Sequence, residues 1–207
     1  MEDNKNSRLL ISFVLDNGVT VPEERLQALT GAFAAFAEAQ RENSGLEFEL
    51  IAYDGFAPTV VKSFEQTAPD AVKAARFPLL GRATMTAVDR LISRVEALKA
   101  EGVTVHRPWV FLLSDGYTVD SLEEVANRLD GLERSGDLLY LPFKLSPTLM
   151  TDRLQSLDRS KHMIEIKEGG MDGFFAFVNR MIEQRASLEA GVGIKFVKTD
   201  FEGWAEL

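Results

Sequence analysis

The 207-residue chain contains no cysteine and only two histidines, His106 and His162. The absence of cysteine excludes disulfides and thiolate metal sites. Because the two histidines lie far apart in the sequence, a histidine-rich zinc site is not expected, and a bound metal ion would need oxygen ligands. We interpret both histidines as surface or half-buried residues rather than as catalytic groups.

The chain also lacks a long apolar run and a basic cluster. No apolar segment approaches the roughly 20 residues that a membrane-spanning helix needs, and the polar start MEDNKNSR lacks the apolar centre of a signal peptide. The 32 acidic residues outnumber the 23 Lys and Arg residues and give a net charge of −9, which repels phosphate backbones. We therefore expect a cytoplasmic protein whose partners include neither membranes nor nucleic acids.

The composition that remains is that of a folded globular domain. Hydrophobic residues make up 45% of the chain and charged residues 27%, proportions that argue against intrinsic disorder. A length of 207 residues fits one domain. We therefore predict a single domain over 1–207, with a C-terminal tail over 190–207.

Apolar runs of strand length alternate along the chain with amphipathic segments of helical length. The runs at 9–15 and 108–114 are apolar almost throughout, as in strands that are buried on both faces. An early turn at Asp54-Gly55 predicts a hairpin and hence one antiparallel edge strand. The predicted fold class is α/β, a Rossmann-like three-layer domain with a mostly parallel, six-stranded central sheet and helices on both faces. The predicted strands cover 9–15, 46–53, 59–64, 108–114, 138–145 and 162–166, and the predicted helices cover 22–43, 67–76, 84–101, 122–134, 149–157 and 172–188.

Polar residues follow two of the apolar strands and begin one of the helices. Asp16 follows the first strand, Asp115 follows the strand at 108–114, Thr20 lies in the first loop, and Thr84 begins a helix. In parallel sheets of this type, ligands bind outside the carboxyl ends of the strands. Two carboxylates and two hydroxyls from three loops could supply the oxygen ligands that Mg²⁺ prefers.

This pattern resembles the von Willebrand factor A domain, whose metal-ion-dependent adhesion site takes residues from the same three loops. The first loop of that family reads Asp-x-Ser-x-Ser, and this chain has Asp16-x-Gly18-x-Thr20. The segment GRATMTAVDRL is similar to the family's Gly-x-Thr segment and contributes Thr84, and PWVFLLSDGYTVD is similar to the strand and aspartate that follow and contributes Asp115. The order of elements matches over about 8–189. Bacterial cytoplasmic members associated with tellurium resistance look most similar, on the LLSDG segment, the compact size and the late helix FFAFVNRMIEQ.

The resemblance implies a protein-interaction module rather than an enzyme. Its metal ion would be Mg²⁺, or Mn²⁺ or Ca²⁺ in its place, held by Asp16, Thr20, Thr84 and Asp115. An Asp or Glu of a partner protein would complete the coordination of the metal. The resemblance further suggests a role in a bacterial stress or tellurium-resistance system.

One position departs from the family pattern, because Gly18 stands where a serine ligand is usual. Glycine has no side-chain oxygen, so a water molecule would have to fill that place and the site would be degenerate. Asn17, Gly18 and Ser114 are expected to line the site. The departure leaves open an alternative in which the domain binds partners through the same loops without a metal.

An enzymatic alternative rests on the spacing Asp16-x-x-x-Thr20, which also looks like the first motif of haloacid dehalogenase-type phosphatases. The general acid of that motif would fall at Gly18, which cannot act as one. No second aspartate stands beside Asp115 to hold a magnesium ion in the manner of those enzymes. The sequence therefore favours a binding module.

Overall fold

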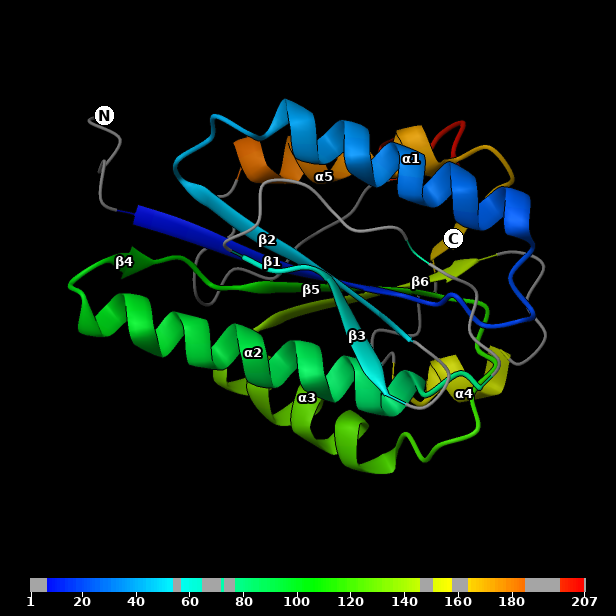
Figure 1. Cartoon of the computed structure of the whole chain (residues 1–207), viewed down its shortest axis with the longest axis horizontal. Helices are drawn as coiled ribbons and strands as arrows, with labels where there is room; N and C mark the ends of the chain where they lie inside the picture. The colour runs from blue at the N-terminus through cyan, green and yellow to red at the C-terminus, as the bar shows by residue number, and fades with distance from the viewer. Residues whose placement is uncertain are drawn as a thin grey trace.

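The computed structural model describes residues 7–53, 57–64, 72, 77–145, 151–157, 164–184 and 198–206, and it has three layers (Figure 1). The central sheet lies between helices α1 and α5 on one face and α2 and α3 on the other. The predicted α/β fold class is therefore confirmed. No helix in these ranges combines the length and the apolar character needed to cross a bilayer.

The observed elements follow the predicted order. The strands are β1 Ser7–Leu15, β2 Leu46–Tyr53, β3 Pro58–Lys62, β4 Thr104–Val105, β5 Trp109–Ser114, β6 Leu139–Leu145, β7 Ile164–Ile166 and β8 Ala205–Glu206. The helices are α1 Glu23–Ala39, α2 Leu80–Ala100, α3 Glu123–Ser135, α4 Thr151–Gln155 and α5 Met171–Glu183, with a 3-10 helix η2 at Lys198–Asp200. The six predicted strands are joined by β4 and β8, which have two residues each and are too short to show a periodicity. Of the predicted helix at 67–76, all but residue 72 lies outside the described residues, as does His162.

The start of α2 differs from the prediction. The sequence places Phe77–Ala83 in a loop and begins the helix at Thr84, whereas the helix begins at Leu80. Thr84 therefore lies one turn inside the helix rather than at its end. The physical reason is a cap supplied by a distant loop, described below.

The strand order of the sheet is β3-β2-β1-β5-β6-β7-β8, with β4 also paired to β1. The strands β1, β2, β5, β6 and β7 are parallel, while β3 and β8 pair antiparallel at the two edges. In the β1–β5 register Leu15 lies opposite Leu113, and the Asp16 backbone N–H donates to the Leu113 carbonyl at 2.9 Å. This register places the residue after β1 beside the end of β5.

Aromatic packing fixes the central strands against the helices on the α1 and α5 face. The Phe13 ring of β1 lies 5.5 Å from the Phe33 ring of α1, 5.4 Å from the Phe111 ring of β5 and 6.4 Å from the Phe174 ring of α5, measured between centroids. Aromatic pairs at such distances add to the burial of their area. The rigid β1–β5 pair is thus a stable base for the loops at its carboxyl end.

An ion pair between a buried glutamate and a partly exposed arginine fixes α2 on the opposite face. The Glu49 carboxylate of β2 is fully buried, and it accepts hydrogen bonds from Ser12 Oγ at 2.7 Å and from Arg90 Nε of α2 at 2.8 Å. A buried carboxylate is tolerated only where such partners satisfy it. The helix that carries Thr84 is therefore held in one position on the sheet.

The C-terminal tail packs onto α5. Trp204 and Phe201 are buried, and a Cβ atom placed on Gly173 would lie 2.3 Å from Trp204 Cβ. Only glycine permits this approach. The Trp204 Nε1 donates to the Asp200 carbonyl at 2.9 Å, which satisfies the indole.

Candidate functional site

Asp16 and Asp115 meet at the carboxyl ends of β1 and β5. The Asp16 side chain is fully buried, and its Oδ2 accepts hydrogen bonds from Ser114 Oγ at 2.6 Å and from the Asp115 backbone N–H at 3.4 Å. Its Oδ1 accepts the Gly18 backbone N–H at 2.9 Å. The structure therefore brings together Asp16, Gly18, Ser114 and Asp115, while Asn17 is buried next to them in the chain.

The electrostatics of Asp16 are unusual for a carboxyl group. Burial, and secondly the negative charge of Asp115, raise the pKa of Asp16 from its ordinary 3.8 to about 7. Hydrogen bonds from Ser114, Gly18 and the Asp115 N–H act in the opposite direction but do not outweigh these two causes. A carboxylate in this position takes up either a proton or a cation at neutral pH, because both neutralise a buried negative charge.

Two buried oxygen atoms in the loops that follow β1 and β5 have no hydrogen-bond partner. The Asp115 Oδ1 accepts the Tyr117 N–H at 2.8 Å, but Asp115 Oδ2 has no partner, and neither does Thr20 Oγ1. Buried polar atoms in folded proteins are almost always paired, so each exception needs an explanation. A carboxylate and a hydroxyl oxygen are ligands that a hard divalent cation prefers. Asp16, Thr20 and Asp115 therefore fit a metal of the Mg²⁺ class.

Thr84 fits such a site less well. It is fully buried, and its Oγ1 donates to the Leu80 carbonyl one turn earlier in α2 at 2.8 Å. In the described part of the chain no hydrogen bond joins it to Asp16 or Asp115. The Thr84 hydroxyl keeps oxygen lone pairs for a ligand, but its hydrogen is used within the helix.

The space beside Gly18 is occupied by a residue that the sequence did not single out. A Cβ atom placed on Gly18 would lie 3.0 Å from Asp16 Oδ1 and 3.3 Å from Pro78 Cβ. A side chain at this position would thus be in tight contact with both Asp16 Oδ1 and the Pro78 ring. No local pattern in the sequence reveals this contact, because Pro78 belongs to a different loop.

Asp120 joins the loop after β5 to the start of α2. Its Oδ1 accepts the Gly81 N–H at 3.2 Å, and its Oδ2 accepts the Arg82 N–H at 2.9 Å. The Thr118 hydroxyl donates to Asp120 Oδ1 at 2.5 Å and accepts the Leu80 N–H at 3.1 Å. The sequence predicts Asp120 or Ser121 as the cap of the helix that follows. Asp120 caps α2 instead, whereas Ser121 Oγ accepts the Glu123 N–H at 3.3 Å at the start of α3. The Asp120 cap lets α2 begin at Leu80 despite the glycine in its first turn.

Acidic and histidine ligands other than the two aspartates do not gather here. Within the described ranges no group of three or more His, Cys, Asp or Glu side chains is arranged to hold a metal ion. A metal at Asp16 and Asp115 would therefore keep several water ligands, as Mg²⁺ commonly does.

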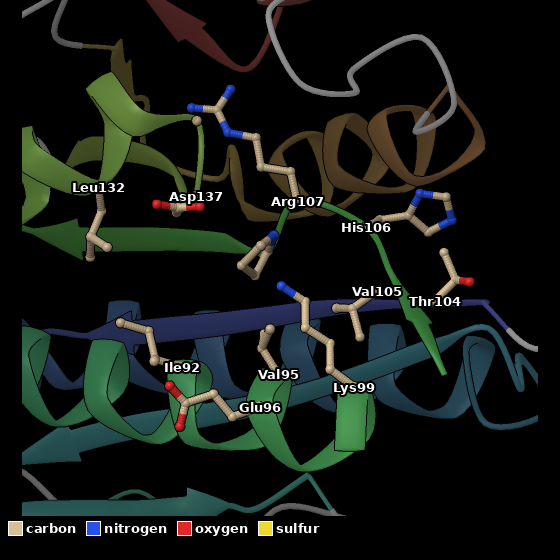
Figure 2. Close-up of a pocket in the computed structure, with 12 residues that line it drawn as sticks. Ile92, Val95, Glu96, Lys99, Thr104, Val105, His106, Arg107, Leu132 and Asp137 are labelled. Carbon is tan, nitrogen blue, oxygen red and sulfur yellow. The ribbon is translucent and has the colours of Figure 1, made fainter. Parts of the chain in front are cut away.

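A recess of about 530 Å³ lies away from this site, where the chain leads into β5 (Figure 2). Lys99 of α2 and the half-buried His106 line it, together with Glu96 and Asp137. Charges of both signs line this recess, and it lies at the amino end of β5, whereas Asp115 follows the carboxyl end. His106 is thus half-buried, as the sequence predicts, and it is not part of the candidate site.

Comparisons with solved structures support the fold, whereas comparisons of the sequence identify no relative. No family model matches the chain, and no curated protein matches it. Among solved structures, proximal thread matrix protein 1 from the mussel byssus superposes with a TM-score of 0.61 at 11% identity, over 84% of this chain and 47% of that one. The VWA domain of SpRpn10 superposes with a TM-score of 0.53 at 11% identity, over 77% of this chain and 88% of that one.

These likenesses concern the fold alone, because identities of 11% carry no information about a shared site. The chain spans about half the length of the mussel protein, at 47%. With helices on both faces of a mostly parallel sheet and the order of elements described above, the chain has the fold of a von Willebrand factor A domain.

Proposed function

We propose that the protein is a protein-interaction module that captures an Asp or Glu side chain of a partner through a divalent metal ion. Asp16, Thr20, Thr84 and Asp115 would hold the metal. The observation that carries the proposal is a pair of buried oxygens without hydrogen-bond partners, Asp115 Oδ2 and Thr20 Oγ1, in the two loops that follow β1 and β5. Asp16, whose pKa is strongly raised, lies in the first of these loops. The fold supports an interaction role, and the order of loops supports this edge of the sheet.

The metal would supply positive charge at a place where two carboxylates otherwise repel each other. Mg²⁺ takes about six oxygen ligands and readily keeps waters, and Mn²⁺ or Ca²⁺ could take its place. With Asp16 and Asp115 ionised, a divalent cation leaves the site close to neutral. A partner carboxylate could then replace a water without meeting a net negative charge.

A second candidate is a module of the same fold that binds partners without a metal. The surroundings of Gly18 favour it, because position 18 supplies no side-chain oxygen and an added Cβ would lie only 3.3 Å from Pro78 Cβ. In that case Asp16 would remain protonated over part of the neutral range. The resemblance in the LLSDG segment supports a setting in the bacterial cytoplasm, in a stress or tellurium-resistance system, for either candidate.

Isothermal titration calorimetry with Mg²⁺, Mn²⁺ and Ca²⁺ at pH 8 tests the metal directly. We expect saturable binding of at least one cation to the wild type and none to Asp115→Asn, which keeps the size of the side chain but removes its charge. Asp137→Asn, an exposed site away from Asp115, is the matched control and should bind as the wild type does. Absence of binding with all three cations would leave the metal-independent module. Turnover of a phosphate ester that Asp16→Asn abolishes would contradict a binding role altogether.

A further inference from the structure

Three exposed apolar side chains lie in the loops around the candidate site. Val19 is 61% exposed, Phe77 is 47% exposed and Val119 is 53% exposed, and they are the large apolar residues that the described part of the chain leaves open to solvent. Single exposed apolar residues are common on protein surfaces and need no explanation. These three, however, belong to the three loops that meet at one edge of the sheet.

Contacts through Pro78 bring the three loops together. Phe77 precedes Pro78 in the chain, and the Val119 N–H donates to the Pro78 carbonyl at 3.1 Å. Gly18, the neighbour of Val19, lies so close to Pro78 that an added Cβ would be 3.3 Å from its ring. Pro78 is therefore the common neighbour. Phe77 precedes it in the chain, Val119 is hydrogen-bonded to it, and Val19 follows Gly18, which packs against it.

The position of the three residues relative to the site is equally well defined. Val19 lies between Gly18 and Thr20, whose hydroxyl lacks a hydrogen-bond partner. Val119 lies between Thr118 and Asp120, which together cap α2. Val19 and Val119 thus lie in the loops that carry the unpaired Thr20 and Asp115 oxygens, and Phe77 precedes Pro78, which contacts both loops.

We infer that Val19, Phe77 and Val119 form an apolar collar that contacts hydrophobic side chains on both sides of the partner's acidic residue. The acidic part of this motif rests on the proposed function, whereas the apolar part rests on the collar alone. The partner segment is therefore a short stretch of protein in which one Asp or Glu stands between large apolar residues. Residues that exclude water around a central polar contact have the same role in other interfaces.

Charge argues for a protein segment over the other possible occupants of the collar. The net charge of −9 opposes docking on an anionic membrane surface and also opposes association with a second copy of the same chain. Around the collar, Arg82 of α2 is exposed on one side, and Glu23 and Glu24 of α1 are exposed on the other. A partner segment with an acidic residue near Arg82 and a basic residue near Glu23 and Glu24 would therefore bind in one orientation.

A displayed library of random seven-residue peptides, selected on the wild-type protein in Mg²⁺ at pH 8, provides the test. We expect the selected peptides to carry Asp or Glu flanked by residues such as Leu, Ile or Phe. A synthetic peptide of the selected sequence should bind Val19→Ser and Val119→Ser about fivefold more weakly than the wild type, and Phe77→Ser about tenfold more weakly. Val105→Ser, the same change at the other end of the sheet, is the control and should leave the affinity unchanged.

The outcomes separate the collar from the metal. The three collar variants should bind Mg²⁺ as the wild type does in calorimetry, because none of the three residues is a ligand. Selected peptides that are acidic and lose binding in EDTA, but bind the three variants unchanged, would overturn the collar and keep the proposed function. Peptides that are apolar without an acidic residue, bind in EDTA and are weakened by the variants would keep the collar and overturn the metal. A selection that yields no binding peptide, or peptides enriched in neither acidic nor apolar residues, would overturn the collar. Dimerisation of the wild type that the collar variants abolish would assign the collar to a second copy of the chain instead.

Discussion

Replacing Asp16 by Asn should stabilise the metal-free protein at neutral and higher pH. The reason is the pKa of Asp16, which burial and the charge of Asp115 raise to about 7. A carboxyl whose pKa is higher in the folded than in the unfolded state holds its proton more tightly when folded. Its stabilising contribution is therefore fully present below about pH 4 and is lost as the pH rises to about 7.

The magnitude follows from the two pKa values. Going from the ordinary 3.8 to about 7 corresponds to about 4 kcal/mol of folding free energy that the wild type lacks above pH 7. Asparagine carries no charge and avoids this cost, but it gives up one oxygen that accepts the Ser114 hydroxyl, at a cost of about 1 kcal/mol. We expect Asp16→Asn to be more stable than the wild type by about 3 kcal/mol at pH 8, or roughly 6–12 °C in melting temperature.

Chemical denaturation of both proteins between pH 4 and pH 8, in buffers with EDTA, measures this difference. Subtracting the two curves removes the contribution of the shared carboxyl groups that do not interact with Asp16. The difference should be close to zero or slightly unfavourable to Asp16→Asn at pH 4 and should grow until about pH 7. Asp137→Asn, which changes an exposed carboxyl, should show no such growth.

A flat difference between pH 4 and pH 8 would refute this reasoning, because it would mean that Asp16 titrates alike in the folded and unfolded states. A wild type that is stabler than Asp16→Asn at pH 8 without metal would refute it more strongly. Saturating Mg²⁺ should reduce the difference in free energy of unfolding between the two proteins by stabilising the wild type, because the cation stabilises only the protein that binds it.

Two further changes test the packing around the site and the tail. Gly18→Ser should lower the free energy of unfolding by about 1 kcal/mol without raising the Mg²⁺ affinity, because the added atoms meet Pro78. Combining Gly18→Ser with Pro78→Ala should remove that contact. Calorimetry should therefore show a gain in Mg²⁺ affinity only in the double variant. Gly173→Ala should lower the free energy of unfolding by about 3 kcal/mol or more, because its Cβ would lie 2.3 Å from Trp204 Cβ. At Gly31, also in a helix, an added Cβ would meet no atom within 4 Å outside the helix's own backbone, so Gly31→Ala should instead stabilise the protein by about 0.5–1 kcal/mol. Equal melting temperatures for Gly31→Ala and Gly173→Ala would contradict these two predictions.

The sequence predicted that Asp16 and Asp115 meet at one edge of the sheet, because the strands that carry them are easily recognised. β1 and β5 are apolar almost throughout and end at Asp16 and Asp115, so that the general behaviour of parallel sheets placed both aspartates at one edge. The last helix, predicted over 172–188, was also recognisable, and α5 covers Met171–Glu183.

The parts that the sequence could not predict depend on contacts between distant loops. The start of α2 at Leu80 requires the cap from Asp120, whereas capping signals in a sequence are read from neighbouring residues. The space beside Gly18 is filled by Pro78, a contact that no spacing reveals. The hydrogen bond from Thr84 to the Leu80 carbonyl is visible only once the helix boundary is known. Whether these residues bind a metal stays a prediction.

The proposed function requires that Asp16, Thr20, Thr84 and Asp115 share a divalent cation. Crystals soaked in Mn²⁺, with data collected near the manganese absorption edge, test it most directly. We expect an anomalous peak about 2 Å from Asp115 Oδ2 and within ligand distance of Thr20 Oγ1. A map with no peak at this edge of the sheet, from crystals in which Asp115 Oδ2 is free of lattice contacts, would contradict it.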